Sequence, residues 1–306
     1  YFNSDGSASV STSQSISLLN EDTINYTHTF GGKHYVSVLG GFTYQDNVNT
    51  SLSGSGTGFL SDVTQTGSLG SASIPGVPGS GFSETTLLSY LGRVNYIFDN
   101  RYLLTASIRA DGASQYSPGK KWGYFPSAAV AWKIKEESFM KDVESISDLK
   151  LRASWGLAGS QAIGAYSTLA NLSSGKTVFG SARYTTFAPG SQMPANLKWE
   201  ITEQYDIGLD VGLLKDRYSF TIDYYHKMTR DLLNSVQLPT STGYSTTLRN
   251  VGKIENKGIE LSANANIISG RNFNWSVNGN ISFNKSKVIS LYDGQDILGG
   301  WERSEE

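Results

Sequence analysis

The sequence predicts an all-β fold, namely a segment of an antiparallel, up-and-down transmembrane β-barrel with about ten strands. Three observations support this prediction. Apolar and polar residues alternate over long stretches, the connections between these stretches are short and long in turn, and aromatic residues gather at both ends of the stretches. One face of the predicted sheet is therefore apolar and the other is polar.

Residues 87–134 show the alternation most clearly, as three long stretches joined by a tight turn at Asp99-Asn100 and a polar loop. In the middle stretch, Tyr102, Leu104 and Ile108 share one face, whereas Arg109 and Asp111 share the other. Successive side chains of a strand point to opposite faces, so this spacing predicts a β-meander with one apolar and one polar face. We expect the apolar face, which includes Val130 and Trp132, to contact lipid.

The same alternation recurs along the rest of the chain, in residues 15–30, 34–46, 149–157, 204–213, 218–228, 259–267 and 273–284. Gly31-Gly32 predicts a tight hairpin turn between the first two. Residues 1–10, 47–83, 159–197 and 232–247 are rich in small and polar residues and are predicted to be loops. Residues 136–148 predict a short connection with one helical turn near residues 139–143.

The connections favour a membrane barrel over a soluble one. Short connections (31–33, 99–101, 136–147, 214–216, 269–271) alternate with mostly longer ones (47–83, 115–121, 159–197, 232–247). Outer-membrane barrels have tight periplasmic turns and long extracellular loops. The predicted strands also exceed the usual length of about 5–6 residues and match the roughly 9–11 residues that cross a bilayer at a tilt.

Aromatic residues form two predicted rows. The row near the short turns contains Phe30, Tyr35, Tyr96, Phe98, Tyr102, Trp132, Tyr218, Phe220, Phe273 and Trp275. The row near the long loops contains Phe42, Tyr44, Tyr90, Trp122, Tyr124, Trp155 and Tyr224. Such rows are typical of aromatic girdles at the two lipid–water interfaces. A soluble sandwich or lipocalin-like barrel, whose apolar face points to a core, is the alternative, because alternation alone does not orient the faces.

Composition excludes several other classes. A net charge of −2 without charge runs gives no electrostatic footprint for nucleic acid. The chain has no cysteine, which excludes disulfides and thiolate metal sites, and no run of about 20 apolar residues that would form a membrane helix. The chain begins at Tyr1 and ends in the polar WERSEE, and we expect both ends to be interior positions of a longer polypeptide.

Four segments carry a family resemblance, and together they cover most of residues 85–290. They read LLSYLGRVNYIFDNRYLLTASIRADGASQYSPGKKWGYFPSAAVAWKIKEESFMK (87–141), LKLRASWGLAGSQAIGAYS (149–167), NLKWEITEQYDIGLDVGLLKDRYSFTIDYYHKMTRDLL (196–233) and GYSTTLRNVGKIENKGIELSANANI (243–267). This series resembles the barrel of SusC/RagA-type TonB-dependent outer-membrane transporters. The loops at 47–83 and 159–197 match that family only in character.

The resemblance implies a fold, a location and a function. Residues 1–306 would be part of one transmembrane barrel of about 22 strands, with the plug domain and the remaining strands outside this sequence. The protein would be integral to the outer membrane of a Gram-negative bacterium. It would import glycan oligomers or peptides with a SusD-like surface lipoprotein and the TonB–ExbB–ExbD complex. The resemblance implies neither catalysis nor a cofactor.

Two alternatives to the importer remain open. A passive porin-type channel would have the same barrel, and a plug domain and TonB box upstream would distinguish the importer from it. A soluble or secreted adhesion module would instead pack the face of Tyr102, Leu104 and Ile108 as a core. The substrate depends on parts that the sequence does not specify, so glycans and peptides both remain candidates.

Candidate site residues fall into two groups. Charged residues on the polar face are candidates to line the lumen: Arg93, Arg109, Asp111, Arg152, Asp206, Asp210, Asp223 and Glu260. Cross-strand ion pairs in a solvated interior are the plainer interpretation of each. Aromatic residues of the long loops are candidates to contact substrate or the lipoprotein lid: Tyr116, Tyr166, Tyr184 and Phe187. Loop packing is the plainer interpretation of these.

Other motifs predict no chemistry. The only histidines are His28, His34 and His226, and without clustered carboxylates or cysteines they predict no metal site. Two SxxK matches, at Ser117 and Ser173, lack the helix and the companion motifs of serine acyl enzymes. The SGSGTG segment near Ser53 lacks the GK[ST] ending of a phosphate-binding loop. We therefore expect no catalytic residue.

Overall fold

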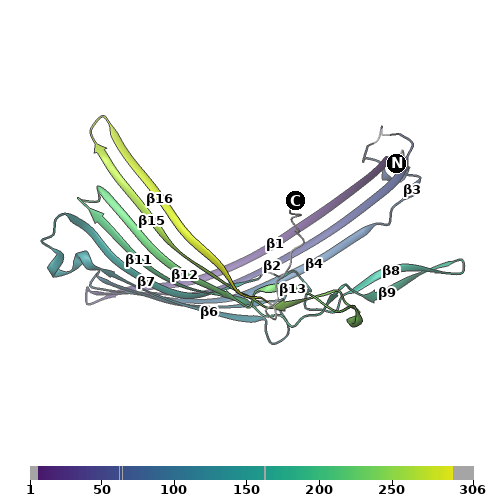
Figure 1. Ribbon diagram of the computed structural model, residues 1–306, viewed down its shortest axis with the longest axis horizontal. Coiled ribbons are helices and arrows are strands. Elements are labelled where there is room, and N and C mark those ends of the chain that lie inside the picture. Colours follow the sequence, from purple (N-terminus) through teal and green to yellow (C-terminus); the bar gives the residue numbers. More distant parts are fainter. Residues whose placement is uncertain (1–5, 62, 64, 162, 292–306) are drawn as a thin grey trace, which may run out of the picture. The chain divides into compact units, whose positions relative to one another are not determined.

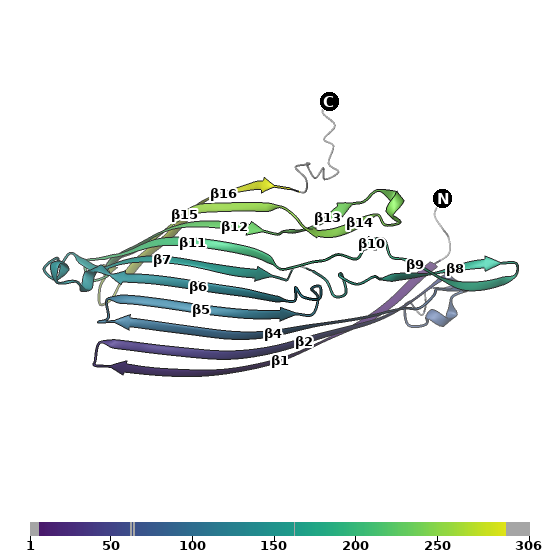
Figure 2. The same cartoon turned by 90° about the horizontal axis from the view of Figure 1, so that it is seen from below.

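The computed structural model describes residues 6–61, 63, 65–161 and 163–291, and strands dominate these residues. The main sheet has the order β1-β2-β4-β5-β6-β7-β11-β12-β15-β16, with β3 paired to β2. Strands β5 to β7, β11, β12, β15 and β16 lie side by side in Figure 2. On this path each strand pairs with the next long strand along the chain, which is an up-and-down arrangement. The prediction of an antiparallel sheet of about ten long strands is confirmed.

The ten strands on the path of the main sheet are long. They are β1 (Gly6–Phe30), β2 (His34–Phe59), β4 (Gly79–Phe98), β5 (Tyr102–Ala113), β6 (Trp122–Lys133), β7 (Ile146–Ser160), β11 (Glu200–Leu213), β12 (Tyr218–Arg230), β15 (Lys253–Ser269) and β16 (Asn274–Ser290). The shorter strands are β3 (Ile74–Pro75), β8 (Leu172–Phe179), β9 (Ala182–Pro189), β10 (Gln192–Met193), β13 (Leu233–Gln237) and β14 (Thr246–Asn250).

The 3₁₀ turns lie in the connections, as η1 (Leu69–Ser71), η2 (Ile134–Glu136), η3 (Ser138–Met140) and η4 (Thr240–Thr242). Turns η2 and η3 replace the single helical turn that the sequence predicts near residues 139–143. Within the described ranges, no helix is both long enough and apolar enough to span a membrane.

The chain divides into two compact units. One contains residues 1–21 and 43–88, and the other contains residues 22–42 and 89–306. In the first unit, β2 pairs with β3 at Gly56 and Thr57, and Ser73 donates to the carbonyl oxygen of Gly58 at 2.7 Å through its hydroxyl. The second unit contains the short turns, most of the strands and the connections from β5 to β6, from β7 to β11 and from β12 to β15. Figure 1 shows its strands β7, β11, β12, β15 and β16.

The register keeps side chains of one kind in continuous rows. Trp155 on β7 faces Ala128 on β6 and Tyr205 on β11, and Tyr205 in turn faces His226 on β12. Since directly paired residues of an antiparallel sheet share a face, the apolar face continues from strand to strand. The polar face continues in the same way through Arg152, Gly208 and Asp223.

Several predicted loops are wrong in extent. Strand β1 begins at Gly6, inside the predicted loop 1–10, while β2 runs on to Phe59 and β4 begins at Gly79, inside the predicted loop 47–83. Strands β8, β9 and β10 lie within 159–197, and β13 and the start of β14 lie within 232–247. The hydrogen bonds between strands join backbone atoms and do not require apolar and polar side chains to alternate. Strands rich in Gly, Ser and Thr therefore show no periodic hydrophobicity in the sequence. The polar WERSEE ending lies outside the described residues.

The short turns depend on left-handed backbone. Gly31 and Gly32 have φ of 55° and 70°, and the amide of Lys33 donates to the carbonyl of Phe30 at 3.3 Å. Asp99 and Asn100 adopt φ of 50° and 54° between β4 and β5. Gly and Asn tolerate this region best, so the predicted turns at 31–33 and 99–101 have a local cause.

Candidate functional site

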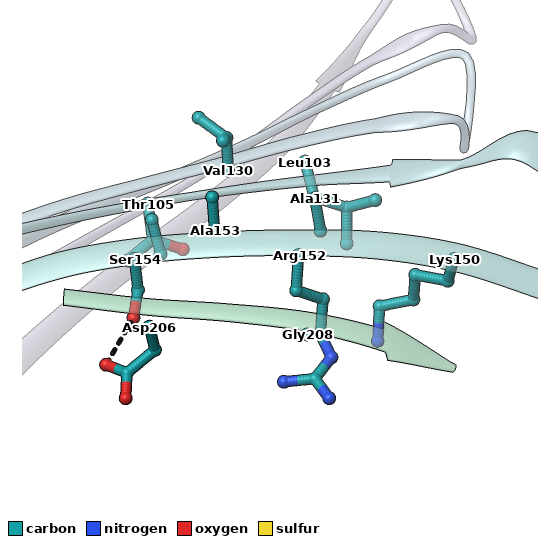
Figure 3. Close-up of a pocket in the computed structure, with 11 residues that line it drawn as sticks. Leu103, Thr105, Val130, Ala131, Lys150, Arg152, Ala153, Ser154, Asp206 and Gly208 are labelled. Carbon is teal, nitrogen blue, oxygen red and sulfur yellow. Dashed lines mark hydrogen bonds between the residues drawn. The ribbon is translucent and has the colours of Figure 1, made fainter. Parts of the chain in front are cut away.

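The apolar face of the sheet is more exposed than the polar face. On β5, Tyr102 and Ile108 lie on the apolar face and are 45% and 52% exposed. Asp111 lies on the polar face and is 7% exposed. Figure 3 shows the same division, with Val130 pointing away from Arg152, Lys150 and Asp206. A soluble sandwich would bury the face of Tyr102, Leu104 and Ile108 as its core. The expectation of the adhesion-module alternative is therefore wrong for these strands.

Two aromatic rows cross the apolar face. Near the short turns, ring centroids are 4.9 Å apart for His34–Phe98, 6.3 Å for Phe98–Tyr102 and 6.5 Å for Tyr102–Trp132. Near the long loops, the centroids are 5.6 Å apart for Phe42–Tyr90 and 6.1 Å for Tyr90–Trp122.

The spacing of the rows fits a bilayer. On β2 the rows are separated by the residues between His34 and Phe42, which span about 26 Å along a strand and about 20 Å across a membrane at the usual tilt. The lipid-facing band of outer-membrane barrels is about 25 Å tall. These contacts have the geometry of the two predicted girdles.

A polar cluster marks the end of the apolar band on β7, β11 and β12. The carboxylate of Glu203 accepts hydrogen bonds from the indole of Trp155 (3.1 Å), the hydroxyl of Tyr205 (2.8 Å) and Arg230 (2.6 Å). Glu203 shares its face with Tyr205 because the two are two residues apart on one strand. This cluster was not predicted from the sequence, although the change from Tyr205 to Glu203 on one face is a readable signal.

On the polar face, an ion-pair network spans three strands. Arg152 on β7 binds Asp210 on β11 through two hydrogen bonds, Nε to Oδ2 at 2.8 Å and Nη2 to Oδ1 at 3.0 Å. Its Nη2 also donates to Asp223 on β12 at 2.9 Å, and Lys150 lies 3.4 Å from Asp210. All four groups are partly exposed, so each pair adds little stability alone. Together, these hydrogen bonds and ion pairs hold the four charged groups at defined positions on the polar face.

Asp206 lies beside this network with a different set of partners. Its carboxylate accepts hydrogen bonds from Ser154 at 3.0 Å, drawn in Figure 3, and from Gln204 at 2.6 Å. Asp206 carries no ion pair among the described residues, and it lines a shallow cavity of about 260 Å³ with Arg152 and Ala129. The negative charge of Asp206 is thus available on the polar face.

The other predicted lumen residues are distributed unevenly. Arg109 contacts both Asp111 (2.7 Å) and the hydroxyl of Ser89 (3.1 Å). Glu260 is exposed and stands opposite Asp223 in the register of β12 and β15, and Arg93 on β4 is exposed. The structure therefore brings together Arg152, Asp210 and Asp223, forms a separate Arg109–Asp111 pair, and adds neither Arg93 nor Glu260 to either group.

The long loops share a small core. Tyr116 is 1% exposed, its ring lies 4.8 Å from that of Trp199, and Trp199 in turn lies 5.4 Å from Phe125. The hydroxyl of Tyr116 donates to the carbonyl of Ser160 at 2.7 Å, and burial raises the pKa of this phenol. Tyr116 is consequently a packing residue, and its burial argues against the predicted contact with substrate or lid.

Hydrogen bonds tie three of the loops to one another. Ser117 accepts from the amide of Leu197 at 2.9 Å. The side chain of Asn250 accepts from the amide of Lys198 at 2.9 Å and donates to the carbonyls of Lys198 (2.7 Å) and Asp231 (2.9 Å). These bonds connect the segments before β6, before β11 and before β15, so the loops form one pre-organised layer.

The β8–β9 hairpin extends from this layer as a separate two-stranded sheet, which Figure 2 shows beyond the ends of β6 and β7. Tyr184 and Phe187 are exposed on it, and so are Phe179 and Val178. An isolated two-stranded hairpin is marginally stable in water. The structure thus leaves Tyr184 and Phe187 accessible, with Tyr166 less so in the preceding loop.

A second cluster that the sequence analysis missed lies at a short turn. The carboxylate of Glu137 accepts from the hydroxyl of Tyr102 (2.6 Å), the indole of Trp132 (3.0 Å) and Arg101 (3.0 Å). The hydrogen bonds from Tyr102 and Trp132 hold the pKa of Glu137 below its ordinary value. No periodic pattern marks Glu137, because it lies in a connection. Over the described ranges, no group of three or more His, Asp or Glu residues could hold a metal ion.

A sheet with an exposed apolar face, two aromatic rows and a charged opposite face is the wall of a membrane β-barrel. The family profile described as "TonB dependent receptor-like, beta-barrel" matches residues 1–301. This chain belongs to that family, and it is an integral outer-membrane barrel protein. The predicted family, fold class and location are confirmed.

Similar proteins agree with this assignment. The chain is 44% identical over 220 residues to the TonB-dependent receptor SusC of Bacteroides thetaiotaomicron, a match that covers 70% of this chain and 22% of SusC. It is 37% identical over 293 residues to the TonB-dependent receptor P3 of Formosa agariphila, covering 96% of this chain and 29% of P3. A solved structure of the RagAB peptide transporter matches with a TM-score of 0.85 and 25% identity, covering 95% of this chain and 32% of that one. The chain thus spans about a third or less of these relatives.

Proposed function

We propose that this chain is part of the wall of an energy-coupled importer, which carries glycan oligomers or peptides across the outer membrane without altering them chemically. Membership of the TonB-dependent receptor family supports energy coupling through the TonB–ExbB–ExbD complex. The similarity to SusC and to the RagAB peptide transporter supports a large nutrient as cargo and a SusD-like surface lipoprotein as partner.

The polar-face network is the observation that carries this proposal. Arg152, Asp210 and Asp223 form a connected charged surface over three strands, with Asp206 beside it. In a closed barrel the face opposite the lipid faces the lumen. These residues, with Arg109 and Asp111, would line the path of the solute or contact the plug through polar groups.

The loop layer provides the outer side of the proposed site. The loops before β6, β11 and β15 are held together by the packing of Tyr116 against Trp199 and by the hydrogen bonds of Asn250. The β8–β9 hairpin exposes Tyr184 and Phe187, whose aromatic rings suit stacking on sugars or burial against a protein lid. We assign the hairpin to partner or substrate contact.

Uptake by the full-length receptor tests the proposal. A bacterial strain that lacks its own copy would express the receptor with its neighbouring lipoprotein, and uptake of a fluorescent oligosaccharide and a fluorescent oligopeptide would be measured with and without TonB. We expect uptake of one cargo class only, and only in cells with TonB. Equal uptake without TonB would establish a passive, porin-type channel instead.

Variants of the hairpin test its role separately. Replacing both Tyr184 and Phe187 by Ser should reduce co-purification of the lipoprotein or binding of the cargo, because exposed aromatic surface is lost. Thr185→Ser on the same strand is the matched control and should leave both unchanged. Normal co-purification and normal cargo binding by the double variant would contradict the assignment of the hairpin.

A further inference from the structure

The connection between β6 and β7 folds onto the apolar face of the sheet. Glu137 is 8% exposed, and its carboxylate is held by Tyr102 and Trp132, two aromatic residues of the row near the short turns. Tyr102 belongs to the exposed apolar face, so the carboxylate of Glu137 lies on that side of the sheet. This places part of a connection against the lipid-facing side.

A second contact fixes the shape of the connection. The ammonium group of Lys135 donates to the carbonyls of Met140 (2.9 Å) and Val143 (2.8 Å), and so closes the chain around η3. Phe139 lies at the centre of η3 and is 65% exposed. The turn therefore leaves an aromatic side chain exposed on a backbone that is held at both ends.

Water is an unfavourable surrounding for Phe139, because its exposed side chain leaves apolar surface in contact with water. The neighbouring short turns repeat the feature, with Leu214 and Phe273 exposed at the same end of the strands. Exposed charged residues of the connection (Glu136, Lys141, Asp142 and Glu144) occur on either side of Phe139. With this arrangement the apolar side chain of Phe139 can enter the bilayer while the charged groups beside it stay in the headgroup region.

We propose that residues 134–145 form an interfacial anchor, in which Phe139 inserts into the periplasmic leaflet of the outer membrane. The occupant of this surface is lipid, because the turn continues the lipid-facing side through Tyr102 and Trp132. Glu137 is the positioning residue, since its hydrogen bonds hold the turn against the aromatic row. The inference rests on the barrel fold and is independent of what the receptor imports.

Site-directed fluorescence tests this anchor. The 306 residues contain no cysteine, so Phe139→Cys can be labelled with a polarity-sensitive fluorophore in a full-length receptor that carries no other cysteine. The labelled receptor would be reconstituted into phosphatidylcholine vesicles with and without lipids that carry a quencher near the headgroup. We expect blue-shifted emission at position 139 and a loss of most of this emission with the quencher lipid.

Two further variants make the outcome decisive. Glu144→Cys, on the same connection, is the matched control and should show aqueous, unquenched emission. Adding Glu137→Ala to Phe139→Cys should weaken the quenching while the receptor stays folded, because the turn loses its bonds to Tyr102 and Trp132. Aqueous emission at position 139 would overturn the proposal, and so would blue-shifted emission that the quencher lipid leaves unchanged, since a protein surface would then cover Phe139.

Discussion

Arg152 on β7 reaches over β11 to donate a hydrogen bond to Asp223 on β12, with Nη2 2.9 Å from Oδ1. The residue between them is Gly208, which faces Arg152 on one side and Asp223 on the other. A Cβ atom at Gly208 would lie 2.8 Å from Cζ of Arg152 and would also meet the carboxylate of Asp223. The bridge across three strands therefore requires a glycine at this position.

Gly208→Ala should break this bridge without unfolding the sheet. The added methyl group meets only the flexible ends of two side chains, so these move and their hydrogen bonds are lost. We expect a cost of about 0.5–1.5 kcal/mol, measured as a shift of the urea unfolding midpoint in vesicles, because the lost hydrogen bonds are partly exposed to solvent. In a chain that already carries Asp223→Asn, Gly208→Ala should cost less. Additive costs in the double variant would show that the two positions are not coupled.

A lysine should be tolerated on one face of β6 and not on the other. Ala128 is exposed on the apolar face between Trp122 and Trp132, whereas its neighbour Ala129 lines the cavity on the polar face. Ala128→Lys should destabilise the folded receptor by about 2–4 kcal/mol, because an ammonium group would face hydrocarbon. Ala129→Lys is the matched control and should cost little. Equal unfolding midpoints in urea for the two variants would contradict the assignment of the faces.

The loop layer should loosen when its central ring is removed. Tyr116→Ala deletes a buried ring between Trp199 and the carbonyl of Ser160, and we expect a cost of about 3–5 kcal/mol to the packing of the loops. Tyr116→Phe keeps the ring, loses one hydrogen bond and should cost about 1 kcal/mol. Limited proteolysis of intact cells should cut the loops of the Ala variant faster than those of the Phe variant. Equal rates would mean that the ring does not organise the loops.

Glu137 should make stability depend on pH. Hydrogen bonds from Tyr102 and Trp132 hold the folded-state pKa of Glu137 below its unfolded value of about 4.3. The stabilisation is therefore complete above that unfolded value and is lost as pH falls through the lower, folded value. Glu137→Gln should lower the thermal midpoint of the receptor at pH 7, and the difference from the native chain should shrink at acidic pH. A difference that stays constant with pH would exclude the ionised carboxylate as the cause.

Several parts of the site could be predicted from the sequence because they depend on strand periodicity. Side chains two residues apart share a face, so the polar positions of Arg152, Asp206, Asp210 and Asp223 were readable one strand at a time. The pairing of these residues could not be predicted in this way, because it depends on the register between β7, β11 and β12. Glu137 and Tyr116 lie in connections, where no period exists, and so the bonds of Glu137 and the burial of Tyr116 were missed.

The sequence by itself determined the two-faced strands, the order of short and long connections, and the family. Each of these follows from local spacing or from a run of residues, which needs no knowledge of distant contacts. The tertiary structure decided which face is exposed, how far the Gly- and Ser-rich strands extend, and that Gly208 lets Arg152 reach Asp223. These features depend on backbone pairing and on packing between strands far apart in the chain, which side-chain periodicity does not encode.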